Sequence, residues 1–385
     1  MGWNIEVINP LPYCPGIDNF LRERKMPPKM EVMNELPVAH VPFFYTPGCL
    51  IEKHYWFYRL TVSKLIKEAV ARLEKSSSDH KYPIHIMLGF IYPDAVALAP
   101  FCQKHGLDYS IMVYGSDFLL RRNQLKFSSL VIQCLQEAPT VFCPGYRLKE
   151  EMVRQGIDKA KIYPFNNGVD HSSFYYFNNE ITANQQSHDS AEEKSILFVG
   201  NLVDVKRVDR LIKAFALLVK DQSVTKDVKP VCLRLDIVGG GPLLPRLKAL
   251  AQKLEIGEQV NFAGRELPQK IASRMRKATC LCLCSASEGM PNVIIESLAC
   301  GCPVLATDVG EVPYLIEESI NGYSVATNDR SEAEIVEELS RSLIKALLKD
   351  DWNRQQIADR MKDYTWPEAA KTIESALVNR SRRNL

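Results

Sequence analysis

Residues 287–310 read SEGMPNVIIESLACGCPVLATDVG, with a glutamate on each side of a Gly-Met-Pro turn. Glu288 stands directly before the turn, and Glu296 lies in the apolar run NVIIESLA (292–299), which has the spacing of a helix. Pro291 suits a first helical turn, because the N–H that proline lacks is not needed there. Apolar runs flank the unit at 278–284 (ATCLCLC) and 303–307 (PVLAT). The stretch therefore predicts a strand, a turn bearing carboxylates, a helix and a second strand.

The same alternation of strands and helices extends along the chain. In the second half, further strands are predicted at ILFVG (196–200), CLRLDIVG (232–239) and QVNFAG (259–264), and helices at 208–220, 244–254 and 267–277. The first half repeats the theme with IEVIN (5–9), HVPFFY (40–45), IHIML (84–88), SIMVY (110–114) and TVFC (140–143). Strand–helix alternation at this spacing predicts α/β domains with parallel, doubly wound sheets.

The two halves are separated by NNEITANQQSHDSAEEK (178–194), which is polar and shows no periodicity. Such a stretch is typical of a linker or an exposed loop. We therefore predict two Rossmann-like domains, at residues 1–175 and 195–365, with a linker at 176–194. A chain of 385 residues is long enough for two domains that each bury a core.

Composition narrows the classes of partner and compartment. A net charge of +2 gives no sign of the strong field that nucleic-acid binding needs, so we expect no nucleic-acid partner. The N-terminus shows no basic region followed by an apolar segment, and no apolar run approaches the roughly 18 residues of a membrane span. The 11 cysteines lack the spacing of a zinc site, and we interpret them as buried, reduced thiols. A reducing, cytoplasmic compartment is the expectation.

Three loops at predicted strand ends carry chemistry that fits one ligand. Lys206 and Arg207 follow ILFVG, a glycine run at 239–241 follows CLRLDIV, and Glu288 follows ATCLCLC. In α/β sheets, ligands bind at the carboxyl ends of the strands. Free N–H groups at a helix N-terminus attract phosphate, whereas carboxylates suit sugar and ribose hydroxyls. Each loop alone is more typical of an ordinary turn or a solvated helix start, but the three together favour a nucleotide-sugar.

At these residues the chain closely resembles the retaining GT-B glycosyltransferases of family 4. The family pattern S-x-x-EG-x-P-x-x-x-x-E-A-x-A-x-G-x-PV is matched by SASEGMPNVIIESLACGCPV (285–304), with Ser297 in place of an alanine. Similar stretches lie at FVGNLVDVKRVDRLIKAF (198–215), IVGGGPLLPRLKALAQKL (237–254), YPDAVALAPFCQKHGLDYSIMVYGSD (92–117), NNGVDHSSF (166–174) and TWPEAAKTI (365–373). The resemblance covers nearly the whole chain and is nearest to the teichuronic-acid and surface-polysaccharide branch.

The resemblance implies a role for each matching residue. Glu288 would contact the donor sugar beside the reacting carbon, and Lys206 would neutralise the leaving diphosphate. Glu296 would bind the ribose hydroxyls. Further donor contacts are expected from Gly289, Met290, Pro291, Asn292, Val293, Asn201, Arg207, Gly240, Gly241 and Arg265. Tyr114 and Asp117 would line the acceptor side of the cleft, and a last helix at about 366–385 would join the first domain. The family needs no metal or other cofactor.

The chain departs from the family pattern at several positions. Asn201 stands where many members have an arginine, and Arg207 follows Lys206 where glycine is usual. Tyr114 replaces a histidine, and Tyr314 replaces a glutamate. MGWNIEVINPLPYCPG (1–16) resembles the second strand of the family and its loop, so the first strand and first helix are expected to be missing. The alternative is that IEVIN is itself a true first strand.

The leading interpretation is an enzyme that transfers a sugar from a nucleotide-sugar to a glycan, with retention, in surface polysaccharide synthesis. The acceptor would be a glycan or a polyprenyl-linked glycan. Two alternatives stay open: an inactive GT-B subunit that supports a catalytic partner, and a GT-B sugar-nucleotide epimerase. A weak attraction to the inner membrane surface is expected from three basic segments, at LRERKMPPK (21–29), FLLRRNQLKF (118–127) and NRSRRNL (379–385).

Overall fold

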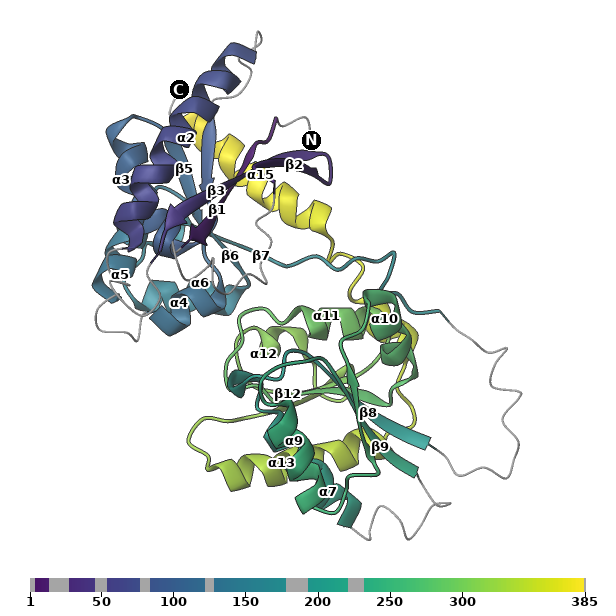
Figure 1. Ribbon diagram of the computed structural model, residues 1–385. Coiled ribbons are helices and arrows are strands. Elements are labelled where there is room, and N and C mark those ends of the chain that lie inside the picture. Colours follow the sequence, from purple (N-terminus) through teal and green to yellow (C-terminus); the bar gives the residue numbers. More distant parts are fainter. Residues whose placement is uncertain are drawn as a thin grey trace. The chain divides into compact units, whose positions relative to one another are not determined.

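The computed structural model describes residues 4–13, 28–45, 54–76, 84–121, 128–177, 193–220 and 232–383. These residues form two units, each built around parallel strands (Figure 1). The first unit comprises residues 1–144, 149–164 and 376–385, and the second comprises residues 145–148 and 165–375. Most of the predicted linker, residues 178–192, lies outside the described residues.

The first unit holds two sheets. Its elements in chain order are β1 (Val7–Tyr13), β2 (Met30–Met33), β3 (Leu36–Phe44), α2 (His54–Ser76), β4 (His85–Leu88), the helical turn η2 (Ile91–Ala95), α3 (Val96–Lys104), β5 (Asp108–Met112), α4 (Gly115–Arg121), α5 (Ser128–Glu137), β6 (Val141–Pro144), α6 (Tyr146–Arg154), η3 (Lys159–Lys161) and β7 (Ile162–Phe165). One sheet has the order β1-β3-β2 and the other β4-β5-β6-β7. Strand β1 pairs with β3 in parallel, and β2 closes a hairpin with β3.

Helix α2 connects these two sheets through packing. Tyr58, Val62, Ile66 and Ala69 recur at three- or four-residue spacing, and all are buried. This periodicity gives the helix one apolar stripe, which packs on β3 and on α3. Among the described strands, β1 and β4 each pair with one neighbour only. The expected absence of a first strand and helix stays a prediction, and the structure itself shows two separate sheets in this unit.

The second unit has one larger sheet. Its elements are β8 (Glu193–Val199), η5 (Asp204–Lys206), α7 (Val208–Lys220), β9 (Cys232–Val238), α9 (Leu244–Lys253), β10 (Val260–Gly264), α10 (Pro268–Lys277), β11 (Cys280–Leu283), α11 (Asn292–Ala299), β12 (Val304–Thr307), α12 (Val312–Leu315), β13 (Gly322–Val325), α13 (Glu332–Leu348), α14 (Arg354–Asp359) and α15 (Trp366–Arg383). The six strands lie in the order β10-β9-β8-β11-β12-β13, and every neighbouring pair is parallel. The predicted doubly wound sheet is confirmed for this unit.

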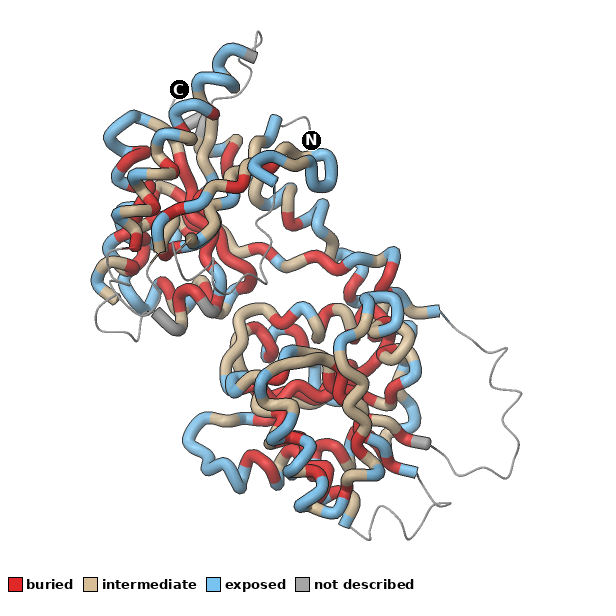
Figure 2. Tube along the Cα trace, viewed as in Figure 1, coloured by how far each residue is buried: buried red, intermediate tan, exposed pale blue. Residues whose placement is uncertain are grey.

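Helices cover both faces of this sheet, so its strands are apolar throughout. Figure 1 shows α7 and α13 on one face and α10 and α11 on the other. All four residues of β11, Cys280–Leu283, are at most 1% exposed, as expected of a strand buried on both faces. The burial pattern in Figure 2 places this core along the central strands. The three cysteines at 280, 282 and 284 are buried free thiols, as predicted, but Cys232 is an exposed free thiol, so the prediction of burial is wrong for that residue.

The last helix, α15, is shared between the two units. Its first residues belong to the second unit, where the Gly168 backbone lies against Trp366. From Ala376 onward it belongs to the first unit, and there Arg380 pairs with Asp108 at 3.0 Å. Its end is therefore fixed at the start of β5.

Candidate functional site

The order of strands in the second unit marks one ligand-binding position. Successive strands run outward from β8 to β9 and β10 on one side, and from β11 to β12 and β13 on the other. The winding direction therefore reverses between the neighbours β8 and β11. In open α/β sheets, ligands bind beside the carboxyl ends of the strands at such a point. The loops that follow β8 and β11 carry Lys206 and Glu288, the two predicted catalytic residues.

Backbone contacts hold these two loops together. The N–H of Ala286 donates to the carbonyl of Val205 at 2.8 Å. The thiol of Cys284, which is fully buried, lies 3.1 Å from the carbonyl of Arg207. Both contacts join the turn after β11 to the turn after β8, so one backbone hydrogen bond and one thiol contact fix the relative position of the turns that carry Lys206 and Glu288.

Lys206 and Glu288 form an ion pair with a third member. The Lys206 Nζ lies 2.7 Å from Glu288 Oε1, and the side chains are 23% and 10% exposed. The hydroxyl of Ser285, a fully buried residue, donates to the same Oε1 at 2.6 Å. One carboxylate oxygen thus accepts from a cation and from a hydroxyl, and this arrangement fixes the Glu288 side chain.

Helix α11 begins directly beside this pair. Pro291 precedes its first residue, and within the described part of the chain no side chain caps its first turn. Free N–H groups at a helix N-terminus attract anions such as a diphosphate. Glu296 lies one turn further on and is half-buried, and burial raises the pKa of its carboxyl group. A carboxylate that is partly removed from water is a strong acceptor for ligand hydroxyls.

Two of the predicted donor residues contact a residue that the site prediction omitted. The Asn167 amide donates to the Asn292 side chain at 2.7 Å, and the Asn167 backbone N–H lies 3.1 Å from the Met290 sulfur. Asn167 belongs to the NNGVD motif at 166–170, and that motif was the available signal. It fixes the turn between Glu288 and helix α11.

The loop after β12 supports the same turn from another side. Glu311 donates its backbone N–H to the carbonyl of Gly289 at 2.9 Å. Gly310 has a φ of +56°, and a Cβ there would lie 2.3 Å from the Gly289 oxygen and 2.4 Å from the Glu288 oxygen. Only glycine fits this close approach. The Thr307 hydroxyl donates to the Ser285 carbonyl at 2.7 Å, which ties β12 to the same site.

The glycine run after β9 packs against the loop after β8. A Cβ at Gly241 would lie 2.4 Å from the Leu202 oxygen, and Leu202 donates its N–H to the Gly240 carbonyl at 3.0 Å. Intramolecular packing therefore already requires a glycine at 241, whether or not a ligand contacts it. Arg265 lies beside Gly240 and is exposed. Asn201 is exposed as well, and its predicted contact with the donor stays a prediction.

Arg207 has partners of its own, away from the Lys206–Glu288 pair. Its guanidinium binds Glu332 at 2.6 Å and Asp209 at 3.0 Å. The buried Arg210 also donates to both oxygens of Glu332, at 2.6 Å and 2.9 Å. Because α13 begins at Glu332, this cluster joins the starts of helices α7 and α13. The contacts of Arg207 are structural, and its predicted role in donor binding stays a prediction.

The two predicted acceptor residues lie in the first unit. Tyr114 follows β5 and is 39% exposed, whereas Asp117 is 7% exposed. The Asp117 carboxylate accepts the backbone N–H of Ile91 at 2.6 Å. It therefore joins the loop after β4 to the loop after β5.

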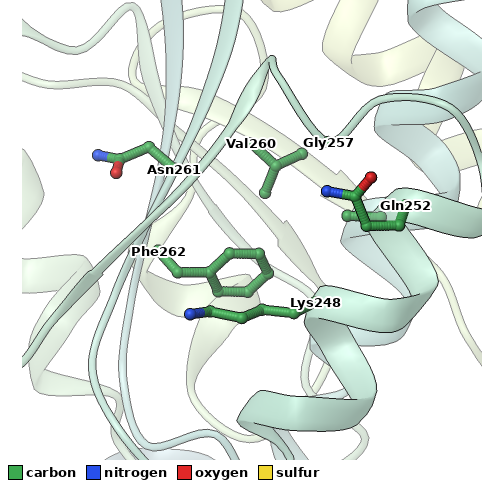
Figure 3. A pocket seen from close by; sticks show the side chains of 7 residues that line it. Lys248, Gln252, Gly257, Val260, Asn261 and Phe262 are labelled. Atoms are coloured by element: carbon green, nitrogen blue, oxygen red, sulfur yellow. The ribbon is translucent and has the colours of Figure 1, made fainter.

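A shallow pocket of about 290 Å³ lies elsewhere in the second unit, between α9 and the edge strand β10. Figure 3 shows the Lys248 side chain along the ring of Phe262, a cation–π contact of 5.9 Å, with the Asn261 amide directed away. None of the predicted site residues lines it. Among the described residues, no cluster of three or more His, Cys, Asp or Glu side chains could hold a metal ion. No helix in the described ranges is long and apolar enough to span a membrane.

Comparisons with known proteins agree with this fold. Residues 180–364 match the family model of Glycosyl transferases group 1. The chain is 26% identical to N-acetyl-alpha-D-glucosaminyl L-malate synthase of Bacillus anthracis, over 69% of this chain and 62% of that protein, so it spans less than two thirds of this relative. It is also 26% identical to the putative teichuronic acid biosynthesis glycosyltransferase TuaC of Bacillus subtilis, over 82% of this chain and 75% of the relative.

Solved structures show the same fold at low identity. HepE of Anabaena in complex with UDP-glucose gives a TM-score of 0.63 at 17% identity, covering 90% of this chain and 86% of that one. The lipopolysaccharide outer core galactosyltransferase WaaB gives a TM-score of 0.64 at 17% identity, covering 89% and 85%. Residues 180–364 therefore resemble the glycosyl transferases group 1, and the chain has the GT-B fold of these glycosyltransferases.

Proposed function

We propose that this protein is a retaining, metal-independent transferase that moves a sugar from a nucleotide diphosphate-sugar to a glycan or lipid-linked glycan. The observation that carries the proposal is the Lys206–Glu288–Ser285 cluster, at the carboxyl ends of β8 and β11 and beside the N-terminus of α11. It joins a cation, a carboxylate and free N–H groups, which suit a diphosphate and a sugar at once.

The donor would bind with its diphosphate at the N-terminus of α11 and at Lys206. Glu296, half-buried one turn into the helix, would accept hydrogen bonds from the ribose hydroxyls. Glu288 would accept hydrogen bonds from the sugar hydroxyls near the reacting carbon. The described structure of HepE contains UDP-glucose, and by analogy a uridine nucleotide is the first donor to test.

In the transfer, the bond between the anomeric carbon and the diphosphate oxygen breaks, and the leaving group keeps its electron pair. A bond then forms from the acceptor hydroxyl oxygen to the same face of that carbon, and the hydroxyl proton passes to the departing phosphate. Lys206 stabilises the charge that develops on the leaving group, an effect that strengthens toward the transition state. The overall reaction releases a nucleoside diphosphate.

The place of this reaction would be cell-surface polysaccharide synthesis on the cytoplasmic side of the membrane. Similarity to TuaC supports this assignment. The expected weak membrane contact rests on sequence alone, because the basic segments at 21–29, 118–127 and 379–385 lie wholly or partly outside the described residues.

A donor-turnover assay tests the proposal. The purified chain is incubated with UDP-glucose, UDP-galactose or UDP-N-acetylglucosamine and with excess EDTA, and UDP release is followed with and without an octyl glycoside acceptor. We expect UDP to bind and one donor to be consumed, with the product keeping the anomeric configuration of the donor by NMR. UDP binding without turnover of any nucleotide-sugar would favour a non-catalytic subunit, and an epimerised donor without release of UDP would favour an epimerase.

A further inference from the structure

Two exposed aromatic rings lie together at the carboxyl ends of neighbouring strands in the first unit. Phe90 comes two residues after β4, and Tyr114 comes two residues after β5. The two strands pair in parallel, with Leu88 opposite Ile111. The ring centroids are 5.4 Å apart with an interplanar angle of 44°. Phe90 is 49% exposed and Tyr114 is 39% exposed.

Buried groups hold this pair in place. The Asp117 carboxylate accepts the N–H of Ile91, next to Phe90, at 2.6 Å. The backbone N–H groups of Asp117 and Phe118 both donate to the Tyr114 carbonyl at 3.1 Å. Phe118 is fully buried. Two rings that are exposed above but fixed from below lose little freedom when a ligand covers them, which is the property of a preorganised binding surface.

The charges nearby exclude some ligands. Two carboxylates lie beside the residues that flank Phe90: Asp117 accepts the N–H of Ile91 at 2.6 Å, and a Cβ at Gly89 would lie 3.4 Å from the Asp94 Oδ2. Burial raises the pKa of Asp94, while hydrogen bonds from the Tyr58 hydroxyl and from backbone at Phe90 and Gly89 lower it. Acidic groups beside Phe90 disfavour a diphosphate. A ligand for this surface should therefore be uncharged where it meets the rings.

A hexose ring has the matching chemistry. Its axial C–H groups form an apolar face that packs on an aromatic ring, while its hydroxyls point outward to polar partners. Tyr114 is 39% exposed, and a tyrosine hydroxyl can both donate to and accept from a sugar hydroxyl. Aromatic side chains bring a large apolar area and, in tyrosine, a polar tip in one residue.

We propose that Phe90 and Tyr114 form a stacking platform for a hexose ring of the acceptor glycan. This inference rests on the proposed transfer function, because it names the site of the acceptor in that reaction. Phe90 was not among the predicted site residues, and the platform gives Tyr114 a defined partner.

The test compares four variants of the full chain. Phe90→Ala and Tyr114→Ala each remove a ring, Tyr114→Phe keeps the ring without its hydroxyl, and Trp56→Ala removes a ring that is 61% exposed on α2 as a matched control. The probes are octyl β-glucoside, octyl β-galactoside and octyl β-N-acetylglucosaminide. Binding is followed by saturation-transfer NMR, and the acceptor KM is measured in the transfer assay with the donor held at saturation.

We expect the ring-removing variants to weaken binding of the preferred glycoside, and to raise its KM, by about 5- to 10-fold each. Tyr114→Phe should keep most of the binding, and Trp56→Ala all of it. UDP binding should be unchanged in Trp56→Ala, and it is measured in the other three variants as a check on folding, because the proposed nucleotide contacts lie in the second unit. Equal glycoside binding by wild type, Phe90→Ala and Tyr114→Ala would overturn the platform while leaving the transfer function intact. If wild type consumes no donor with or without an acceptor, the transfer function itself is refuted instead.

Discussion

Replacing Glu288 by glutamine should tighten binding of UDP while it lowers turnover. Glu288 holds Lys206 at 2.7 Å, so an incoming diphosphate must compete with this carboxylate for the ammonium group. Glutamine keeps the size of the side chain and can still accept the Ser285 hydroxyl, but it removes the negative charge. Lys206 would then be free to bind the diphosphate.

The size of the effect follows from the geometry. Two unit charges at this separation interact by roughly 6 kcal/mol at an effective dielectric constant of about 20. Desolvation and the water around Lys206, which is 23% exposed, offset most of this interaction energy. We therefore take the net free energy of the Lys206–Glu288 pair as about 1–2 kcal/mol. Converted to affinity, this predicts a Kd for UDP about 5- to 30-fold lower than in wild type. Turnover should fall by on the order of 10²-fold, because Glu288 no longer orients the sugar.

The assay is calorimetric titration of UDP into wild type and Glu288→Gln, together with initial rates of donor turnover. Glu337→Gln serves as the control, since Glu337 is an exposed glutamate on α13 that is not part of the site. A Kd for UDP that is unchanged or higher in Glu288→Gln, with an unchanged Tm, would refute the idea that the carboxylate and the phosphate compete for Lys206.

Three further changes probe the surroundings of the site. Gly310→Ala places a Cβ 2.4 Å from the Glu288 carbonyl oxygen, so the turn must move. We expect kcat to fall by on the order of 10²-fold with a small change in Tm, as measured by steady-state kinetics and thermal unfolding. An unchanged kcat would show that the turn tolerates the methyl group. Ser285→Ala removes one hydrogen bond to the Glu288 carboxylate, so kcat should fall about 10-fold while the donor KM stays nearly constant. A donor KM that rises by the same factor would argue against a positioning role. The third change concerns pH. Hydrogen bonding to Arg274 lowers the pKa of Glu266 to about 2, and this effect outweighs burial of the carboxyl group, which by itself would raise the pKa. Because this pKa is depressed, the pair stabilises the fold above the ordinary value near 4.5 and the stabilisation is lost as pH falls toward 2. At pH near 6 the free energy of unfolding of wild type should exceed that of Arg274→Met by about 1–2 kcal/mol. The difference in Tm between the two proteins should narrow below pH 4, and a difference that stays constant with pH would show that the pair does not titrate in this way.

Local pattern was sufficient for most of the second unit. Predicted strands at 196–200, 232–239, 259–264, 278–284 and 303–307 correspond to β8 to β12, and the predicted helices correspond to α7, α9, α10 and α11. These elements are apolar runs or amphipathic stripes bounded by Gly, Pro or Asp, so short-range sequence carries the signal. The short strands β2, β7 and β13 and the helix α13 were not predicted. Strand β13 (GYSV) is only partly buried, unlike the four-residue strands β11 and β12, which are largely apolar and buried throughout, so its local pattern is weak without its neighbours in the sheet.

The candidate site divides in the same way. The sequence by itself selected Lys206, Glu288 and Glu296, because strand ends and family-like spacing are local features of the chain. Only the tertiary structure decided which groups meet. Lys206 and Glu288 are 82 positions apart, and Lys206 and Ser285 donate to the same oxygen of Glu288. Arg207 is bound by Glu332, 125 positions away. The same holds for Phe90 and Tyr114, which become neighbours because β4 and β5 pair in parallel. Contacts between distant residues depend on strand order and register, which are set by packing of the whole sheet and leave no mark within a short window of sequence.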